Sequence, residues 1–195
     1  MNLLKPIELN RLHITKVKKW SDIKDEALEL IKFIDEKQDK FEGNFSACYA
    51  LHHVQVNKEP YNFFVIAKNV HGSKKNQFIS RVIINPKIVE APERIEYYVP
   101  EKDFNTKKDD SVDIGFKNVK KLIPNLIDPI EGCMSFPNRT EKHVDRFFKI
   151  KVQYQVPLFW GFWLKTKTEW VEGLKAHIFQ HEIDHGNGIT IYYDK

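Results

Sequence analysis

The first strong pattern in the chain is a helical repeat of apolar positions between residues 21 and 40. Apolar side chains recur there every three or four residues, which is the spacing of one face of an α-helix. They are Ile23, Ala27, Leu30, Ile31 and Ile34. Ser21 is followed closely by acidic residues and is a suitable N-cap. The pattern predicts an amphipathic helix over 21–40 that packs its apolar face against the core.

The middle of the chain contains short runs of β-branched and aromatic residues that end at Pro, Asn or Gly. Such runs favour strands, and the residues that end them favour turns. The predicted strands are 61–67, 78–86 and 94–100. Residues 145–157 alternate polar and apolar side chains, as a half-buried strand does. The run "FWGFWLKTKTEW" is expected to return beside that strand as a hairpin, with Gly161 at a turn or bulge.

The last predicted element is a helix over about 168–185. Thr166 and Glu169 have the spacing of a capping box at its start, and Gly186 suits the left-handed position after its end. The order is therefore a helix, several antiparallel strands and a final helix, which indicates an α+β fold. The strands are expected to surround the C-terminal helix. The length of 195 residues suits one well-buried core, so a single domain over 1–195 is expected.

Composition and charge exclude several classes of protein. Hydrophobic residues make up 42% and charged residues 30%, a soluble globular balance. The net charge of +4 is spread among acidic residues and forms no basic stripe, which argues against a nucleic-acid partner. No run approaches the ~18 apolar residues that span a bilayer, so no membrane partner is expected. The N-terminal sequence lacks a secretory pattern, which predicts a cytoplasmic protein with reduced cysteines.

The chain's clearest chemical motif is "FQHEIDHGNG" at residues 179–188. On a helix His181 and His185 project from the same face and can bind one metal ion. Glu182 can then reach a water on that ion and move its proton. The alternative is a helix with two surface histidines. It is disfavoured because the apolar Leu174 and Ile178 share the histidines' face, which points that face toward the core.

A metal site of this kind needs a third protein ligand. The long metalloprotease pattern would place a histidine at position 191, where this chain has Ile191. The third ligand is therefore expected upstream of the helix. The candidates are Cys133, Cys48, His13, His52, His53, His71, His143 and His177. Spacing alone does not choose among them.

Two segments of the chain resemble signatures of the peptide deformylase family. "EGCMS" at 131–135 is similar to the family's E-G-C-L-S, with Met134 in place of the usual Leu. "QHEIDH" at 180–185 is similar to its Q-H-E-x-D-H, although Gly186 replaces the Leu that usually follows. The resemblance covers roughly 20–100 and 128–192, and the connection over about 98–128 is longer than the family's. That stretch is expected to be a surface insertion.

A third family signature, G-L-A-A-P-Q-V, is only partly matched. "ALHHVQV" at 50–56 keeps the residues Leu51, Gln55 and Val56. His52 and His53 stand where the family has two alanines. This departure puts the local packing and the approach of substrate in question, although Gln55 is present.

The resemblance implies that Cys133, His181 and His185 are the metal ligands, which leaves one open tetrahedral position. The expected ion is Fe²⁺, with Zn²⁺, Ni²⁺ or Co²⁺ able to substitute. The implied reaction removes the N-terminal formyl group from formyl-methionyl nascent peptides. A metal-bound hydroxide attacks, and Glu182 is the general base and acid. The implied partners are an N-formylated peptide and, as a second candidate, the ribosome.

Further residues take roles by the same resemblance. The side-chain amide of Gln55 and the backbone N–H of Met134 would stabilise the oxyanion. The expected substrate-binding residues are Leu51, Glu131, Leu174 and His177. His177 stands where the family usually has an apolar residue of the methionine pocket. It either makes that pocket more polar or smaller, or is satisfied by a core hydrogen bond.

Two other functions stay open at this point. One is a divergent metal-dependent amidase or peptidase with a different substrate, and the other is a non-catalytic deformylase-like binding module. Cys133 could also be a nucleophile paired with a histidine, while Cys48 is expected to be buried and inert. An active deformylase is favoured because Glu182 is retained although no structural task for it is evident.

Overall fold

A computed structural model describes residues 13–40, 49–68, 81–91, 130–133, 142–144, 146–158 and 163–192. Several predictions fall outside these ranges. They are the strand over 94–100, the insertion over about 98–128, Cys48, Met134 and Gly161. In the part of the chain that is described, no helix is long and apolar enough to span a bilayer.

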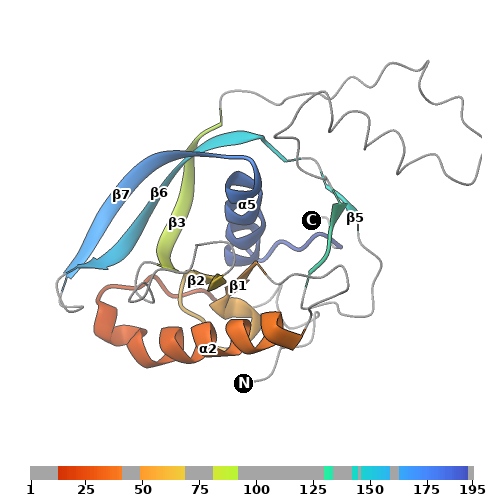
Figure 1. Ribbon diagram of the computed structural model, residues 1–195. Helices are drawn as coiled ribbons and strands as arrows, with labels where there is room; N and C mark the ends of the chain where they lie inside the picture. The colour runs from red at the N-terminus through yellow and green to blue at the C-terminus, as the bar shows by residue number, and fades with distance from the viewer. Residues whose placement is uncertain are drawn as a thin grey trace, which may run out of the picture.

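A five-stranded antiparallel sheet forms the centre of the molecule (Figure 1). In spatial order its strands are β1 (Ala50–His52), β2 (Phe63–Ile66), β3 (Val82–Glu90), β6 (Lys149–Leu158) and β7 (Trp163–Glu172). The β6–β7 pair is continuous from Lys149 opposite Glu172 to Leu158 opposite Trp163. The strands predicted over 61–67 and 145–157 are present as the shorter β2 and the later-starting β6, and their existence and the hairpin are confirmed. Strand β3 ends at Glu90 rather than at residue 86.

Both faces of the sheet are covered by a helix, which explains why all four residues of β2 are buried. Phe63 and Val65 belong to the core on the side of helix α2 (Lys24–Lys40). Phe64 and Ile66 belong to the core on the side of helix α5 (Leu174–Gly186). Figure 1 shows α2 and α5 packed against different parts of the curved sheet. The α+β fold with antiparallel strands around a C-terminal helix is therefore confirmed.

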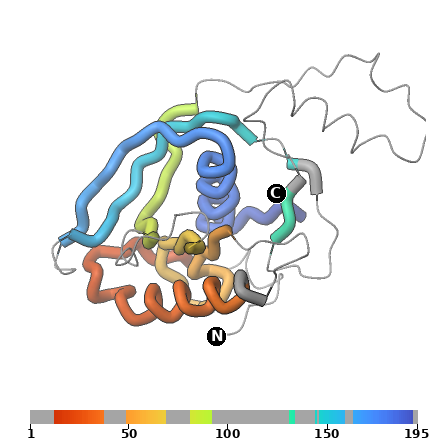
Figure 2. Tube along the Cα trace, viewed as in Figure 1, coloured from red at the N-terminus to blue at the C-terminus, as the bar shows by residue number. Residues whose placement is uncertain are grey.

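A short second sheet brings the middle of the chain to the end of α5. It pairs β4 (Ile130–Glu131) with β5 (Lys142–His143) in antiparallel register. Figure 2 shows the segment after α5 running beside this pair. In agreement, Ile191 packs with Cys133, and both side chains are 8% exposed. Cys133, two residues after β4, is thus placed beside the final helix.

The start of the final helix was predicted incorrectly. Residues 168–172 continue strand β7, and α5 begins at Leu174 after Gly173, whose φ of 62° makes the turn. The capping box of Thr166 and Glu169 does not form. Thr166 lies opposite Gln155 in the hairpin, and Glu169 accepts a hydrogen bond from the Tyr154 hydroxyl at 2.8 Å. Pairing along the whole hairpin therefore outweighs a local capping signal.

Two other helix ends differ from the predictions. A 3-10 turn, η1 (Trp20–Asp22), contains Ser21, so Ser21 is not the N-cap of α2. Asp22 instead accepts the backbone N–H of Lys19 at 2.8 Å. Gly186 is the last helical residue of α5 and does not have a left-handed conformation, which is found at Gly188 with φ 72°. The apolar positions of α2 are nevertheless buried as predicted, from Ile23 at 1% to Ile34 at 0% exposure.

Candidate metal centre

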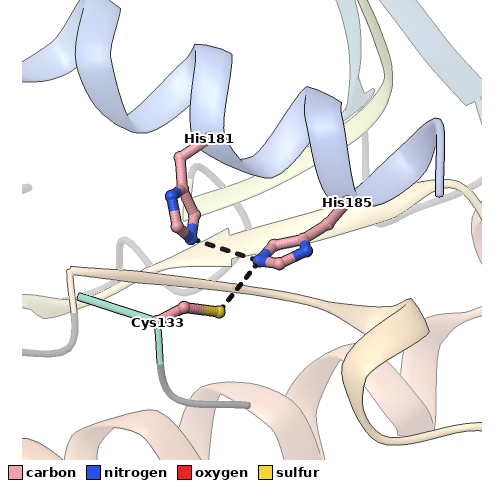
Figure 3. Close-up of side chains that lie close together, drawn as sticks. All are labelled: Cys133, His181 and His185. Atoms are coloured by element: carbon pink, nitrogen blue, oxygen red, sulfur yellow. Dashed lines mark hydrogen bonds between the residues drawn. The ribbon is translucent and has the colours of Figure 1, made fainter. Parts of the chain in front are cut away.

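Three potential metal ligands from two distant segments converge in one place (Figure 3). His181 and His185 project from neighbouring turns of α5, and Cys133 approaches them from the segment after β4. The Nε2 atoms of the two histidines are 3.1 Å apart, and the Cys133 Sγ is 3.3 Å from His185 Nε2. All three ligand atoms lie within 4.8 Å of one another. No other group of three such side chains occurs among the described residues.

The spacing and chemistry of these donors fit a divalent ion. With metal–nitrogen bonds of ~2.0–2.1 Å and a metal–sulfur bond of ~2.3 Å, the edges of a tetrahedral site are about 3.3–3.6 Å long. The contacts at 3.1 and 3.3 Å are only slightly shorter than such edges. One thiolate and two imidazoles suit iron, zinc, cobalt or nickel. Of the upstream candidates in the described part of the chain, Cys133 is the one that completes a group with both histidines.

A buried carboxylate fixes the orientation of the first histidine. Glu131 is 4% exposed, and its Oε2 lies 2.7 Å from His181 Nδ1. A proton on Nδ1 is donated to Glu131, which leaves Nε2 free to bind a metal. Burial alone would raise the pKa of Glu131, but hydrogen bonds from His177, His181 and Arg146 outweigh it and hold that pKa well below its usual range. Glu131 therefore stays ionised and keeps the His181 ring in place.

Arg146 connects this carboxylate to the helix. Its Nε donates to Glu131 Oε1 at 2.6 Å and its Nη2 donates to Oε2 at 3.0 Å, a two-pronged contact. Its Nη1 donates to Asp184 Oδ2 at 2.5 Å. Asp184 precedes His185, so the same guanidinium holds Glu131 and the turn of α5 that carries the second histidine.

Gln180 makes a second attachment between α5 and the segment before β6. Its Oε1 accepts the backbone N–H of Phe147, and its Nε2 donates to the carbonyl of Phe147, both at 2.9 Å. The residues directly before His181 and His185 are thus both tied to the 146–147 segment. These attachments hold the metal-binding face of α5 toward Cys133.

Glu182 is buried beside the ligands with one oxygen left without a partner. The side chain is 3% exposed, and no described group hydrogen-bonds to its Oε2. Burial raises the pKa of Glu182 to about 7, and the negative charge of Glu131 adds to this effect while His181 opposes it. A carboxyl group with a pKa near neutrality can both take up and return a proton. The Oε2 atom has no hydrogen-bond partner among the described groups and can therefore accept a proton.

Gln55, at the end of the 3-10 turn η2 (His53–Gln55), directs its amide nitrogen toward the same place. It is 2% exposed, and its Oε1 accepts the backbone N–H of His52 at 2.8 Å. Because the oxygen is engaged there, the NH₂ group faces the centre, with Nε2 3.9 Å from Cys133 Sγ. This is the orientation that a donor to a developing oxyanion requires.

The remaining predicted site residues are placed differently. His177 is next to Glu131, with its Nε2 2.5 Å from Oε1, in agreement with a core hydrogen bond. Leu51 is fully buried in the core on the α2 side, so its side chain lies away from the ligands. Leu174 begins α5 and is 40% exposed. Met134 lies outside the described residues.

Arg146, Asn62 and Gly186 lie beside the site, and no sequence pattern indicated a role for them in it. Asn62, directly before β2, is in contact with the His52 ring. Gly186 approaches the same ring from α5. The available signal was that His52 and Gly186 both depart from the deformylase pattern, but nothing in the sequence indicated that the two departures meet.

Known proteins similar to this chain agree with the geometry. The family profile described as polypeptide deformylase matches residues 10–195. A peptide deformylase of Thermotoga petrophila is 38% identical over 91 residues, which cover 41% of this chain and 49% of that protein. The chain thus spans about half the length of the first curated relatives that it matches.

Solved structures extend the similarity to nearly the whole fold. The peptide deformylase of Thermotoga maritima superposes with a TM-score of 0.58 at 24% identity, over 98% of this chain and 94% of that one. A probable peptide deformylase from a Synechococcus phage gives a TM-score of 0.57 at 23% identity, over 98% and 97%. At these identities the structures show a shared fold, and the profile match shows the family. The chain belongs to the polypeptide deformylase family.

Proposed function

We propose that this protein hydrolyses the N-terminal formamide of formylated peptides. The observation that carries the proposal is the unpartnered Oε2 of the buried Glu182, which directly follows His181 on α5, together with the convergent donors of Cys133, His181 and His185. A divalent ion on these ligands would act as a Lewis acid, lowering the pKa of a water and polarising the formyl carbonyl. The other chemical tasks fall to side chains of this chain.

The roles of those side chains follow from their positions. Glu182 takes a proton from the water that attacks the formyl carbon. As the carbon–nitrogen bond breaks, it returns that proton to the leaving amine, so formate and a free N-terminus are released. The amide of Gln55 donates a hydrogen bond to the oxygen on which negative charge develops. The backbone N–H of Met134 is proposed as a second donor.

We propose formyl-methionyl peptides as the substrates and Fe²⁺ as the ion. Cytoplasmic nascent chains, with the ribosome nearby, are the proposed source of such peptides. The side chains proposed to meet the peptide are Leu174 and His177, because Leu51 can offer only its main chain and Glu131 is occupied by four hydrogen bonds. The contact between His177 and Glu131 supports a role of His177 in orienting Glu131 more than a role in selecting the substrate's side chain.

The direct test is formate release from formyl-Met-Ala-Ser by protein purified without oxygen and reloaded with iron. The wild type is expected to turn over, and Glu182→Ala to lose about 10²–10⁴-fold in kcat while keeping one metal per chain. Acetyl-Met-Ala-Ser is the control substrate. Metal binding without formate release would overturn the deformylase proposal. Cleavage of the acetyl peptide at the same rate would indicate a broader amidase.

A further inference from the structure

His52 is a fully buried side chain whose ring lies against the last turn of α5. A Cβ atom on Gly186 would lie 3.1 Å from His52 Nε2 and 3.2 Å from Asn62 Oδ1. Both distances are shorter than an ordinary van der Waals contact to carbon. A side chain at residue 186 would therefore require the His52 ring and Asn62 to shift by a few tenths of an ångström. Gly186 directly follows the ligand His185.

The hydrogen bonds of the His52 ring define its orientation. The backbone N–H of Val54 donates to Nδ1 at 3.1 Å, so the ring proton must be on Nε2. Nε2 then donates to Asn62 Oδ1 at 3.3 Å. Both nitrogens are thus satisfied, as buried polar atoms require. Burial also lowers the pKa of His52 to about 3, which keeps the ring neutral. The ring is therefore held in one orientation between β2 and α5.

The main chain of His52 holds the two groups that the proposed chemistry uses. Its N–H donates to Gln55 Oε1 at 2.8 Å, which directs the Gln55 amide nitrogen toward Cys133. The backbone of His52 also lowers the pKa of Glu182 by hydrogen bonding to its carboxyl group. A displacement of β1 at this residue would move both the proposed oxyanion donor and the proposed base.

We propose that His52 is a positioning residue that sets the separation between the β1–η2 segment and α5. The His52 ring and the Asn62 side chain together occupy the space beside the bare backbone of Gly186, so the size of the ring and the absence of a side chain at 186 must match. The inference rests on the proposed function for its effect on turnover, but its effect on ligand geometry is independent of that function. The matched sizes explain how two departures from the deformylase pattern are tolerated in one site.

The test exchanges the sizes of the two side chains. His52→Ala removes the ring, Gly186→Ala and Gly186→Leu add atoms that crowd the ring and Asn62, and His52→Ala/Gly186→Leu carries out the full exchange. Each single variant is expected to lose about 10- to 100-fold in kcat on formyl-Met-Ala-Ser with a smaller change in KM. The double variant is expected to recover most of that loss. His53→Ala is the matched control, because His53 is equally buried but stacks on Phe63 on the α2 side.

The second readout does not depend on turnover. The visible absorption spectrum of the Co²⁺-loaded protein reports ligand geometry, and it is expected to change in His52→Ala and Gly186→Ala and to return in the double variant. His53→Ala should keep the wild-type spectrum. If the spectra behave this way but the wild type releases no formate, the positioning role stands and the proposed function fails. If His52→Ala matches His53→Ala in spectrum and kcat, or the exchange restores neither, the positioning role is overturned.

Discussion

The two sides of the central sheet are built by different rules. On the α2 side, aliphatic and aromatic residues close the core, and Leu30, Ile34 and Phe63 are each 0% exposed. On the α5 side, the helix buries Glu182 and His185 and packs near Glu131, all at 4% exposure or less. Burying charged groups costs free energy unless they are paired, and Glu182 keeps an oxygen that is not. The buried residues on the α2 side mainly stabilise the fold, whereas those on the α5 side include polar groups that lower the stability and are suited to a chemical role.

The largest test of this comparison is at Glu131, where both properties meet. Glu131→Ala would leave Arg146, His177 and His181 without their common acceptor. We expect it to lower the free energy of unfolding by about 3–5 kcal/mol and the metal affinity by about 10–100-fold. Urea unfolding and competition with a chelator measure the two losses. Glu131→Gln, which keeps acceptor and shape, should lose less, and a variant with wild-type metal affinity would contradict the assigned role.

The corresponding change on the α2 side should separate stability from chemistry. Leu30→Ala leaves a cavity in an apolar core and is expected to cost about 2–5 kcal/mol of unfolding free energy. The metal affinity and the kcat of the folded protein should stay at wild-type values, because Leu30 touches the α2-side core. Leu28, which is 39% exposed on the same helix, provides the control variant Leu28→Ala. A large fall in metal affinity for Leu30→Ala would show that the two sides are not independent.

Acid should weaken the α2 side through His53. Burial lowers the pKa of His53 to about 4 although Glu26 Oε2 lies 3.6 Å from its Nε2. The unfolded chain takes up the proton near pH 6.5 while the folded protein resists it, so stability is full above that pH and is lost as the pH falls toward 4. Between pH 7.5 and 5.5 this residue should account for about 1.4 kcal/mol.

Urea unfolding of the wild type and of His53→Ala at both pH values measures that contribution. Between pH 7.5 and 5.5, the unfolding free energy of the wild type should fall by about 1.4 kcal/mol more than that of His53→Ala. This difference does not depend on how His53→Ala changes stability at neutral pH, and differences of about 0.5 kcal/mol can be resolved. His13→Ala, at an exposed histidine, is the control variant. An equal change of stability with pH in the wild type and His53→Ala would show that folding does not lower the pKa of His53.

The smallest expected effect lies on the α5 side but away from the ligands. Tyr154 packs against Phe179, and its hydroxyl donates to Glu169 at 2.8 Å. Tyr154→Phe removes this hydrogen bond and keeps the ring, so a loss of about 0.5–1.5 kcal/mol is expected in thermal or urea unfolding. Turnover should not change. Thr168→Ala, which breaks an exposed contact with Gln153, should cost less, and the reverse order would contradict the burial argument.

The same contrast explains what could be predicted from sequence. The α2 side follows hydrophobic periodicity, so the helix and its buried positions were identified correctly. The first residue of the helix was not identified correctly, because Asp22 accepts the backbone N–H of Lys19 in a local turn, and the spacing of apolar residues does not indicate such a turn. The start of α5 was missed since Thr166 and Glu169 also suit a strand, and the choice is made by pairing with residues of β6 that are close only in the folded chain.

The candidate site divides in a similar way. The histidine pair follows from helical spacing, and the assignment of Cys133 depended on the family resemblance. The contact of Glu131 with His177 and His181 could not be derived from spacing, because β4 and α5 meet only through the fold. The match between His52 and Gly186 was hidden for the same reason. Hydrophobic periodicity describes a single helix or strand, whereas a buried polar network is formed by side chains from several elements that meet only in the folded chain.

The hydrogen bonds of Gln180 have a consequence for the mechanics of the site. Its amide accepts from and donates to one residue, Phe147, in the way that a peptide unit of an adjacent strand would. Helix α5 is therefore held in one register relative to the segment before β6, because a shift by even one residue would present a different side chain to Phe147. Sliding of the helix along its axis, which apolar packing alone would tolerate, is blocked. The positions of His181 and His185 along the helix axis are therefore fixed by hydrogen bonds to a neighbouring main chain, as residue positions in a β-ladder are.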